Sequence, residues 1–264
     1  MSTTDNAEAY DRPPLPDSRA ASSMNSLAGY QRLTIHPRQI QGQQVQLTPG
    51  QSHYLGRVLR LSAGDEFIAM DGQGHWWRAQ LLTPTTAQLG EPLPVWRELP
   101  APIALLMGIP KGDGMDQVVR QATELGVRQI WPLITERTQV HPGSGRIERW
   151  RRIATEAAEQ SWRQWIPEVF PAQPLVTAVT QVGAMPKLVC DPAPERPHLV
   201  TLLPPEPAAL AILIGPEGGW SPAEMAWLQD QGAQVVSLGR RVLRTVTAPV
   251  VALALIGASW EGYG

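Results

Sequence analysis

Several features that would assign the chain to common protein classes are missing. A single cysteine, Cys190, excludes an internal disulfide and fits a reducing compartment. No apolar run is long enough to span a membrane, and the N-terminus lacks the cationic start and apolar stretch of a secretory signal. The net charge of −2 gives no overall positive field that would attract nucleic acid. We therefore expect a cytoplasmic protein with no membrane partner, in which any nucleic-acid contact is a local patch.

Common catalytic signatures are also missing. No glycine-rich segment has the Gly-Lys-Ser/Thr end of a P-loop or the spacing of the dinucleotide fingerprint. No His/Cys cluster has metal-ligand spacing, so we expect no metal, and no Ser-His-Asp arrangement is evident. With 43% hydrophobic and 17% charged residues, the chain nevertheless has the composition of a globular protein with a sizeable core.

Composition and periodicity divide the 264 residues into three parts. Residues 1–29 are rich in Pro and Ser without a periodic apolar face, which predicts a disordered extension. Residues 30–97 contain short alternating segments between glycine turns, which is typical of a small β-barrel. After a proline-rich linker, residues 98–264 alternate strand and helix patterns, which indicates an α/β fold with a mainly parallel sheet.

The apolar pattern predicts individual elements in both domains. In the first domain we expect strands at residues 66–70 and 76–82. In the second we expect strands at residues 103–109, 129–134, 187–190, 209–214 and 234–238, and helices from Asp113 to Gly126 and over residues 149–165 and 248–259.

The most informative segment runs from residue 209 to residue 224. A nearly continuous apolar strand ends in Gly215-Pro216-Glu217-Gly218-Gly219. Ser221 is a predicted N-cap, with Pro222 at the first helical position and Glu224 as its capping-box partner. Such a loop at the carboxyl end of a buried strand is where α/β sheets bind ligands, although a tight turn without a ligand has the same pattern.

A second loop has a similar design. The strand at residues 234–238 ends in Gly239, and the chain then leads toward the helix at 248–259 with Thr247 as a candidate N-cap. Two such loops after strands that are close in sequence can frame one pocket at the edge of a sheet.

At these two loops the chain resembles a known family, the RsmE-type ribosomal RNA methyltransferases of the SPOUT superfamily. Further motifs occur in the order typical of that family over residues 30–262. They are Arg57-Val58-Leu59-Arg60, Lys111-Gly112-Asp113, Ala122-Thr123-Glu124-Leu125-Gly126-Val127, Thr135-Glu136-Arg137, Arg149-Trp150 and Glu156-Ala157-Ala158-Glu159-Gln160. Each motif alone is modest, but their order is specific.

The resemblance implies a PUA-like β-barrel followed by a SPOUT domain with a deep trefoil knot, acting as a homodimer through the knotted domain. It also implies methyl transfer from S-adenosylmethionine to N3 of a uridine in 16S rRNA of the small ribosomal subunit. The cofactor would lie in loops around residues 188–191, 214–219 and 237–243. The implied contacts are Leu188, Cys190, Ile214, Gly215, Pro216, Gly218, Gly219, Leu238, Gly239, Val242 and Leu243.

Three residues depart from the family pattern. Val246 replaces a glutamate, Arg240 replaces a proline, and Trp162 stands where glycine is common. Val246 removes a charge near the expected cofactor loop, which gives weight to a non-catalytic RNA-binding or ribosome-assembly protein on the same fold. A SPOUT methyltransferase with another RNA target is a further alternative.

Arginines are the candidate functional side chains. We expect Arg244 to be the catalytic cation that stabilises the uracil oxygens, or else to form a structural salt bridge, for which Glu217 is the candidate partner. The candidate RNA contacts are Arg57, Arg60, Arg149, Arg152 and Arg163. For those on the helix at 149–165, a solvated face with interleaved glutamates is the alternative.

Overall fold

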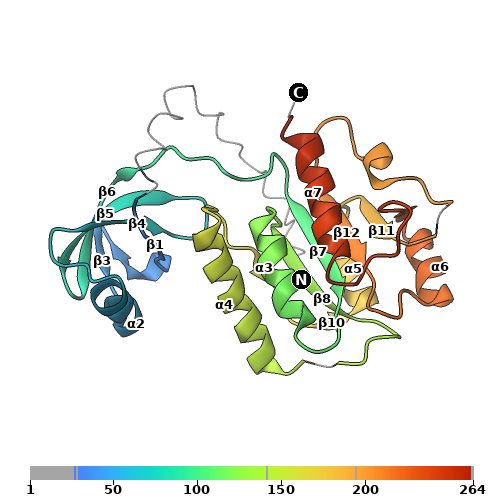
Figure 1. The fold of residues 1–264 in the computed structure, drawn as a ribbon, viewed down its shortest axis with the longest axis horizontal. Helices are drawn as coiled ribbons and strands as arrows, with labels where there is room; N and C mark the ends of the chain where they lie inside the picture. Colours follow the sequence, from blue (N-terminus) through green and yellow to red (C-terminus); the bar gives the residue numbers. More distant parts are fainter. Residues whose placement is uncertain (1–26, 28, 141, 194, 263–264) are drawn as a thin grey trace, which may run out of the picture. The chain divides into compact units, whose positions relative to one another are not determined.

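The structure is a computed structural model that describes residues 27, 29–140, 142–193 and 195–262 (Figure 1). The predicted disordered extension, residues 1–29, lies outside the described residues except for residues 27 and 29. The described chain forms two compact units, which are considered one at a time. The first contains the residues up to Glu98 together with residues 155–166, and the second contains residues 99–154 and 167–262.

A curled sheet forms the first unit. Its strands, as far as the chain is described, are β1 (Arg32–Thr34), β2 (Ile40–Gln41), β3 (Gln44–Gln46), β4 (Glu66–Met70), β5 (Trp76–Thr83) and β6 (Thr86–Pro92). They are ordered β1-β4-β5-β6-β3-β2, and only the β1–β4 pair is parallel among these strands. The predicted strand at residues 66–70 is confirmed residue for residue, and the strand predicted at 76–82 extends by one residue.

Both faces of this sheet are covered. Because side chains alternate along a strand, Phe67 and Ala69 of β4 enter one apolar cluster while Ile68 and Met70 enter another. The second cluster also contains residues from 155–166, since Ala158 is buried in it and Trp162 packs against it. A late segment of the sequence therefore completes the core of the first unit.

A short helical segment leads to Arg57 and Arg60, two of the candidate RNA contacts. Helix α2 (Pro49–His53) is capped by Thr48, and a π-helical turn (Tyr54–Val58) follows it directly. Leu55 points into the core, whereas Arg57 and Arg60 are exposed.

A parallel sheet forms the centre of the second unit. In the described residues its strands are β7 (Ile103–Gly108), β8 (Gln129–Ile134), β9 (Glu168–Val169), β10 (Gln173–Pro174), β11 (Lys187–Cys190), β12 (Leu210–Ile214) and β13 (Gln234–Val236). The order is β10-β8-β7-β12-β11-β13, with β9 beside β8, and each pairing is parallel. The carboxyl ends of β11, β12 and β13 therefore meet at one edge.

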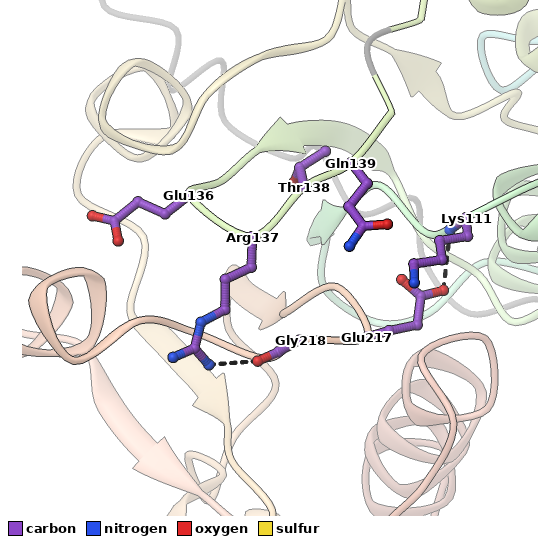
Figure 2. A pocket seen from close by; sticks show the side chains of 7 residues that line it. All are labelled: Lys111, Glu136, Arg137, Thr138, Gln139, Glu217 and Gly218. Atoms are coloured by element: carbon purple, nitrogen blue, oxygen red, sulfur yellow. Dashed lines mark hydrogen bonds between the residues drawn. The ribbon is translucent and has the colours of Figure 1, made fainter.

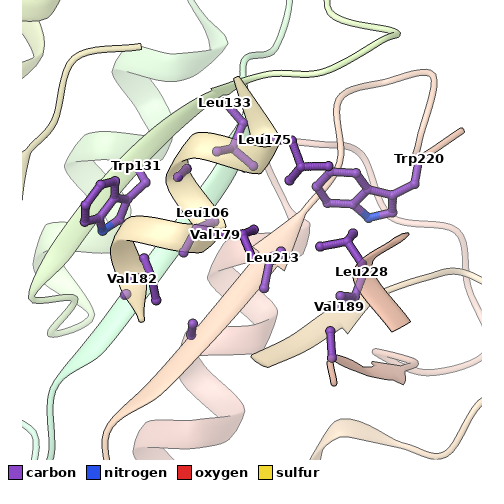
Figure 3. Packing of buried hydrophobic residues seen from close by; sticks show 14 residues of the cluster. Leu106, Trp131, Leu133, Leu175, Val179, Val182, Val189, Leu213, Trp220 and Leu228 are labelled. Carbon is purple, nitrogen blue, oxygen red and sulfur yellow. The ribbon is translucent and has the colours of Figure 1, made fainter. Parts of the chain in front are cut away.

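Helices cover both faces of this sheet. They are α3 (Gly114–Glu124), the first part of α4 (Ser144–Gln160), α5 (Leu175–Val182), α6 (Pro222–Asp230) and α7 (Ala248–Trp260). Figure 3 shows one face, where Val179 of α5 and Leu228 of α6 pack on Leu106 and Leu213 of the strands. Helix α7 lies beside α3 and contacts β12 (Figure 1). The predicted α/β architecture is confirmed in this unit.

Helix α4 begins at Ser144, earlier than predicted, and it also ends earlier, because its last turn closes at Trp162. The backbone N–H of Arg163 donates to the carbonyl of Ala158 at 2.9 Å, and Trp162 has φ +63°. This is the Schellman arrangement, in which the residue after the cap takes the left-handed conformation that glycine favours. The structure thus explains why glycine is common at this position in the resembling family. Thr247 occupies the N-cap position of α7 as predicted, but its side chain makes no capping hydrogen bond.

Candidate functional site

The first loop leaves β12 at Ile214 and enters α6 at Ser221. The predicted capping box is confirmed: Ser221 Oγ accepts the Glu224 N–H at 3.1 Å, and Glu224 Oε2 accepts the Ser221 N–H at 2.9 Å. The same buried carboxylate also accepts the backbone N–H of Glu136 at 2.8 Å. One glutamate therefore fixes both the start of α6 and the loop that follows β8.

The second loop follows β13. Ser237 Oγ accepts the Gly239 N–H at 3.0 Å, and Gly239 has φ +115°, which a residue with a side chain rarely adopts. Val242 is 80% exposed. The turn closes where the Arg244 carbonyl accepts the N–H groups of Thr247 and Ala248.

The third loop follows β11. Asp191 Oδ1 accepts the Ala193 N–H at 2.8 Å, and the Asp191 N–H donates to the Val236 carbonyl at 2.9 Å. Burial, with a smaller contribution from the charge of Asp191, raises the pKa of the Cys190 thiol to about 12. The thiol is therefore protonated at neutral pH and cannot serve as a nucleophile.

These three loops enclose one cavity of about 320 Å³, within the usual range of about 300–1,000 Å³ for small-molecule sites. It is lined by ten of the predicted cofactor residues: Cys190, Ile214, Gly215, Pro216, Gly218, Gly219, Leu238, Gly239, Val242 and Leu243. Leu188 is not among the lining residues, because it lies buried inside β11 between Ile212 and Gln234.

A second cavity, of about 520 Å³, shares a wall with the first. Arg137, Glu217 and Gly218 line both cavities. Figure 2 shows the shared wall: Arg137 Nη1 donates to the Gly218 carbonyl at 2.5 Å, and Glu217 Oε1 accepts the backbone N–H of Lys111 at 3.0 Å. Two loops that are distant in sequence are thus tied to the glycine segment.

Sequence reasoning missed part of this lining. Arg137 and Lys111 appeared only as motif residues, and Glu217 only as a candidate salt-bridge partner of Arg244. Arg137 follows the strand at residues 129–134, and that position at a strand's carboxyl end was the available signal. The other lining residues of the first cavity were not named as contacts: Asp191 and Arg241 lie within the predicted loops, whereas Pro192, Trp220, Thr245 and Ala248 lie outside them.

Arg244, the predicted catalytic residue, is exposed and is not among the residues that line either cavity. Among the described residues no hydrogen bond or ion pair joins its side chain to Glu217, whose carboxylate contacts Lys111 instead. Two of the departures from the family pattern also lie outside both linings. Val246 packs near Gly114, and Arg240 is exposed.

The candidate RNA contacts have different surroundings. Arg57, Arg60 and Arg152 are exposed. Arg149 is exposed but pairs with Asp116 at 2.6 Å, and the hydrogen bond and charge of Asp116 raise its pKa. Arg163 does not fit the prediction: it is 2% exposed and pairs with Glu98, so its guanidinium supports the fold and cannot reach a phosphate.

In the part of the chain that the structure describes, no group of three His, Cys, Asp or Glu side chains could hold a metal ion. No helix in that part is both long and apolar enough to cross a membrane.

Comparison with known proteins identifies the family. Residues 97–257 match the RNA methyltransferase domain, and residues 47–89 match the RNA methyltransferase PUA domain. Ribosomal RNA small subunit methyltransferase E of Synechocystis sp. is 45% identical over 246 residues, which are 91% of this chain and 81% of that protein. The chain belongs to this methyltransferase family. The E-type methyltransferase of Bacillus subtilis is 30% identical over 231 residues, 81% of this chain and 90% of that protein.

Solved structures agree with the family. The E-type methyltransferase from Neisseria gonorrhoeae, solved with S-adenosyl methionine, has a TM-score of 0.77 and 30% identity over 88% of this chain and 98% of its own. A methyltransferase from Legionella pneumophila, solved with bound SAM, has a TM-score of 0.79 and 32% identity over 87% of this chain and 98% of its own. The predicted fold class of an α/β methyltransferase domain after a PUA-like domain is confirmed.

Proposed function

We propose that the protein transfers a methyl group from S-adenosylmethionine to N3 of a uridine in 16S rRNA of the small ribosomal subunit. The observation that carries the proposal is the cavity between the glycine loops at the carboxyl edge of the parallel sheet. It lies in a chain whose E-type relatives are named as small-subunit rRNA methyltransferases and include a protein solved with this cofactor.

The cavity suits an adenosine with a sulfonium side chain. Gly219 and Gly239 both line it with positive φ, and a Cβ at either position would meet no described atom within 4 Å. The missing side chains therefore leave room for a ligand against the backbone. The apolar Ile214 and Leu238 and the carboxylate of Asp191 complete a mixed lining, as a nucleoside requires. We propose the ten lining residues predicted from sequence as its contacts.

The chemistry assigns separate tasks to the two cavities. S-adenosylmethionine, when bound, supplies the methyl group. The chain must hold uridine N3 next to it and accept the N3 proton. We propose that the second cavity receives the uracil and that Glu217 accepts the proton, because Glu217 lines both cavities. The backbone N–H of Lys111 donates to Oε1 of Glu217 and holds that carboxylate oxygen in place.

We also propose roles for the cationic side chains around the site. Lys111 and Arg137 line the second cavity and can stabilise negative charge on the uracil oxygens. We keep Arg244 as a further candidate for that role, because the exposed side chain is free to turn toward a bound substrate. Arg57, Arg60, Arg149 and Arg152 are the proposed RNA contacts, and Arg163 is withdrawn from that set.

The larger assembly is also proposed. We propose a PUA-like RNA-binding domain over residues 30–97 and a SPOUT domain over residues 98–264 with a deep trefoil knot, which forms a homodimer in the cytoplasm. The two matched domain families, at residues 47–89 and 97–257, support the division.

The decisive experiment compares 16S rRNA from the parent strain and from a strain lacking the gene by mass spectrometry. We expect one 3-methyluridine to disappear and to return when purified protein and S-adenosylmethionine are added to subunits from the deletion strain. A nucleoside profile that is the same in both strains would overturn the function. If calorimetry then detects no affinity for S-adenosylmethionine, the non-catalytic alternative holds, and loss of a different methylated nucleoside would identify another RNA target.

A further inference from the structure

The second residue after α4 carries a large side chain in a backbone conformation that disfavours one. Trp162 has φ +63°, a left-handed conformation that is unfavourable for a residue with a Cβ. Glycine would take the same Schellman position without that cost. The indole therefore has to be explained by what it contacts.

Trp162 contacts two arginines of the first unit. The guanidinium of Arg32 lies 3.6 Å from the centroid of the indole, and that of Arg97 lies 4.9 Å from the same ring. Arg32 is further fixed, because its Nη1 and Nη2 donate to the carbonyls of Tyr30 and Leu27. We call Arg32, Arg97 and Trp162 the Trp162 cluster. Stacking on an aromatic face sets the plane of a guanidinium before any ligand arrives.

The cluster has positive charge without a matching carboxylate. Among the described residues no ion pair involves Arg32 or Arg97, whereas Arg78 of the same unit pairs with Glu66. Burial, together with the charge of Arg97, lowers the pKa of Arg32 to about 10, so it is still protonated at neutral pH. Two cations beside one ring repel each other, and an anion between them would remove that repulsion.

Part of the donor capacity of the cluster is unused. A guanidinium has five N–H donors in a planar fork, and Arg32 uses two of them on backbone carbonyls. Its Nε is buried and has no partner among the described residues, so the second N–H of Nη1 and of Nη2 are the donors that remain for a ligand. Arg97 is exposed, and among the described residues its side chain has no hydrogen bond or ion pair beside its contact with the ring and its repulsion with Arg32. Oriented arginine forks are suited to phosphate oxygens, which accept bidentate hydrogen bonds.

We propose that Arg32 and Arg97, held on Trp162, bind a backbone phosphate of the rRNA substrate. The inference rests on the proposed function for the identity of the partner, since an rRNA methyltransferase must hold a polyanion. This phosphate site is separate from the arginines of residues 57–60 and comes from residues that are far apart in the sequence. It gives the segment 155–166 a binding role in addition to its packing role.

The test measures the affinity of the full-length protein for a 16S rRNA transcript over a range of salt concentrations. Each phosphate contact contributes about 0.7–0.9 to the slope of log K against log salt. We expect Arg97→Gln to lower the affinity and to reduce the slope by that amount, and Arg97→Lys, which keeps the charge, to restore most of the slope. Arg32→Gln should act in the same direction.

Arg38→Gln is the matched control, because Arg38 is an exposed arginine of the same unit outside the cluster. Equal affinities and slopes for Arg97→Gln and Arg38→Gln would overturn the phosphate site. Calorimetry with S-adenosylmethionine on the same proteins separates the two proposals. An unaltered protein that neither binds the cofactor nor methylates subunits refutes the proposed function, whereas normal cofactor binding with an unchanged salt slope in Arg97→Gln refutes only the phosphate site.

Discussion

At the scale of single residues, Glu217 provides the sharpest test of the mechanism. Glu217→Gln keeps an oxygen for the Lys111 N–H but cannot accept a proton. We expect the methylation rate at neutral pH to fall by about 10²–10⁴, the usual contribution of a general base. The rate of this variant should then rise steeply with pH, because alkali ionises N3 without help from the protein.

Arg244→Ala is the comparison for that experiment. Loss of a stabilising cation should lower the methylation rate by the same factor at acidic and at alkaline pH, since it does not change which group accepts the proton. Cofactor affinity, measured by calorimetry, should be unchanged in both variants. If Glu217→Gln has the rate and pH profile of the unaltered protein, Glu217 is not the proton acceptor.

Glu159, a second carboxylate, is tested through stability. Burial raises the pKa of Glu159, and its Oε1 accepts the Thr34 N–H at 2.8 Å. The folded protein thus holds this proton more tightly than the unfolded chain, so the group favours folding in acid and loses that contribution as the pH rises through its folded pKa. Glu159→Gln keeps the acceptor without the charge, and its Tm relative to the unaltered protein should rise between acidic and neutral pH. A difference in Tm that is constant with pH would contradict this.

At the scale of elements, strand ends position the first cavity. Strand β7 ends at Gly108, where an added Cβ would lie 2.5 Å from Pro216 N and Cδ. Gly108→Ala should push the first loop out of place, lower stability by about 1–3 kcal/mol as overpacking does, and weaken cofactor affinity. Gly145→Ala is the control, because a Cβ there meets no described atom within 4 Å. Calorimetry with S-adenosylmethionine compares them, and equal affinities would show that Gly108 does not position the loop.

Elements were predictable where the periodicity was continuous. The strands at residues 129–134 and 187–190 were found residue for residue, because both are short apolar runs between polar turns. The end of α4 was not, since no glycine marks the left-handed position that Trp162 takes.

Ten cavity residues were predicted because parallel strands end at one edge and the family resemblance names the loops. Arg163 was misassigned because sequence alone does not show that Glu98 is buried beside it.

At the scale of the whole molecule, the chain passes between its two units at residues 98/99, 154/155 and 166/167. No sequence pattern indicates that residues 155–166 pack with the first unit, because this depends on contacts across more than sixty residues of separation, such as the Arg163–Glu98 pair. Glu98 accepts from Arg163 at 2.5 Å through Oε2 and from the Gln164 and Trp165 N–H groups through Oε1. This carboxylate thus joins, within the first unit, the two chain segments that lead out of it.

Glu98→Gln tests that role. Removing one charge of a buried pair is strongly destabilising, so we expect the free energy of unfolding to fall by about 3 kcal/mol or more. Glu148→Gln is the matched control: Glu148 pairs with Arg151 at 2.6 Å, but its side chain is 68% exposed, and such surface pairs contribute about 0–1 kcal/mol. Denaturant unfolding of both variants measures the difference. Similar losses in the two would mean that the Glu98 carboxylate does not hold residues 155–166 to the first unit, and that the apolar contacts of Ala158 and Trp162 carry that attachment alone.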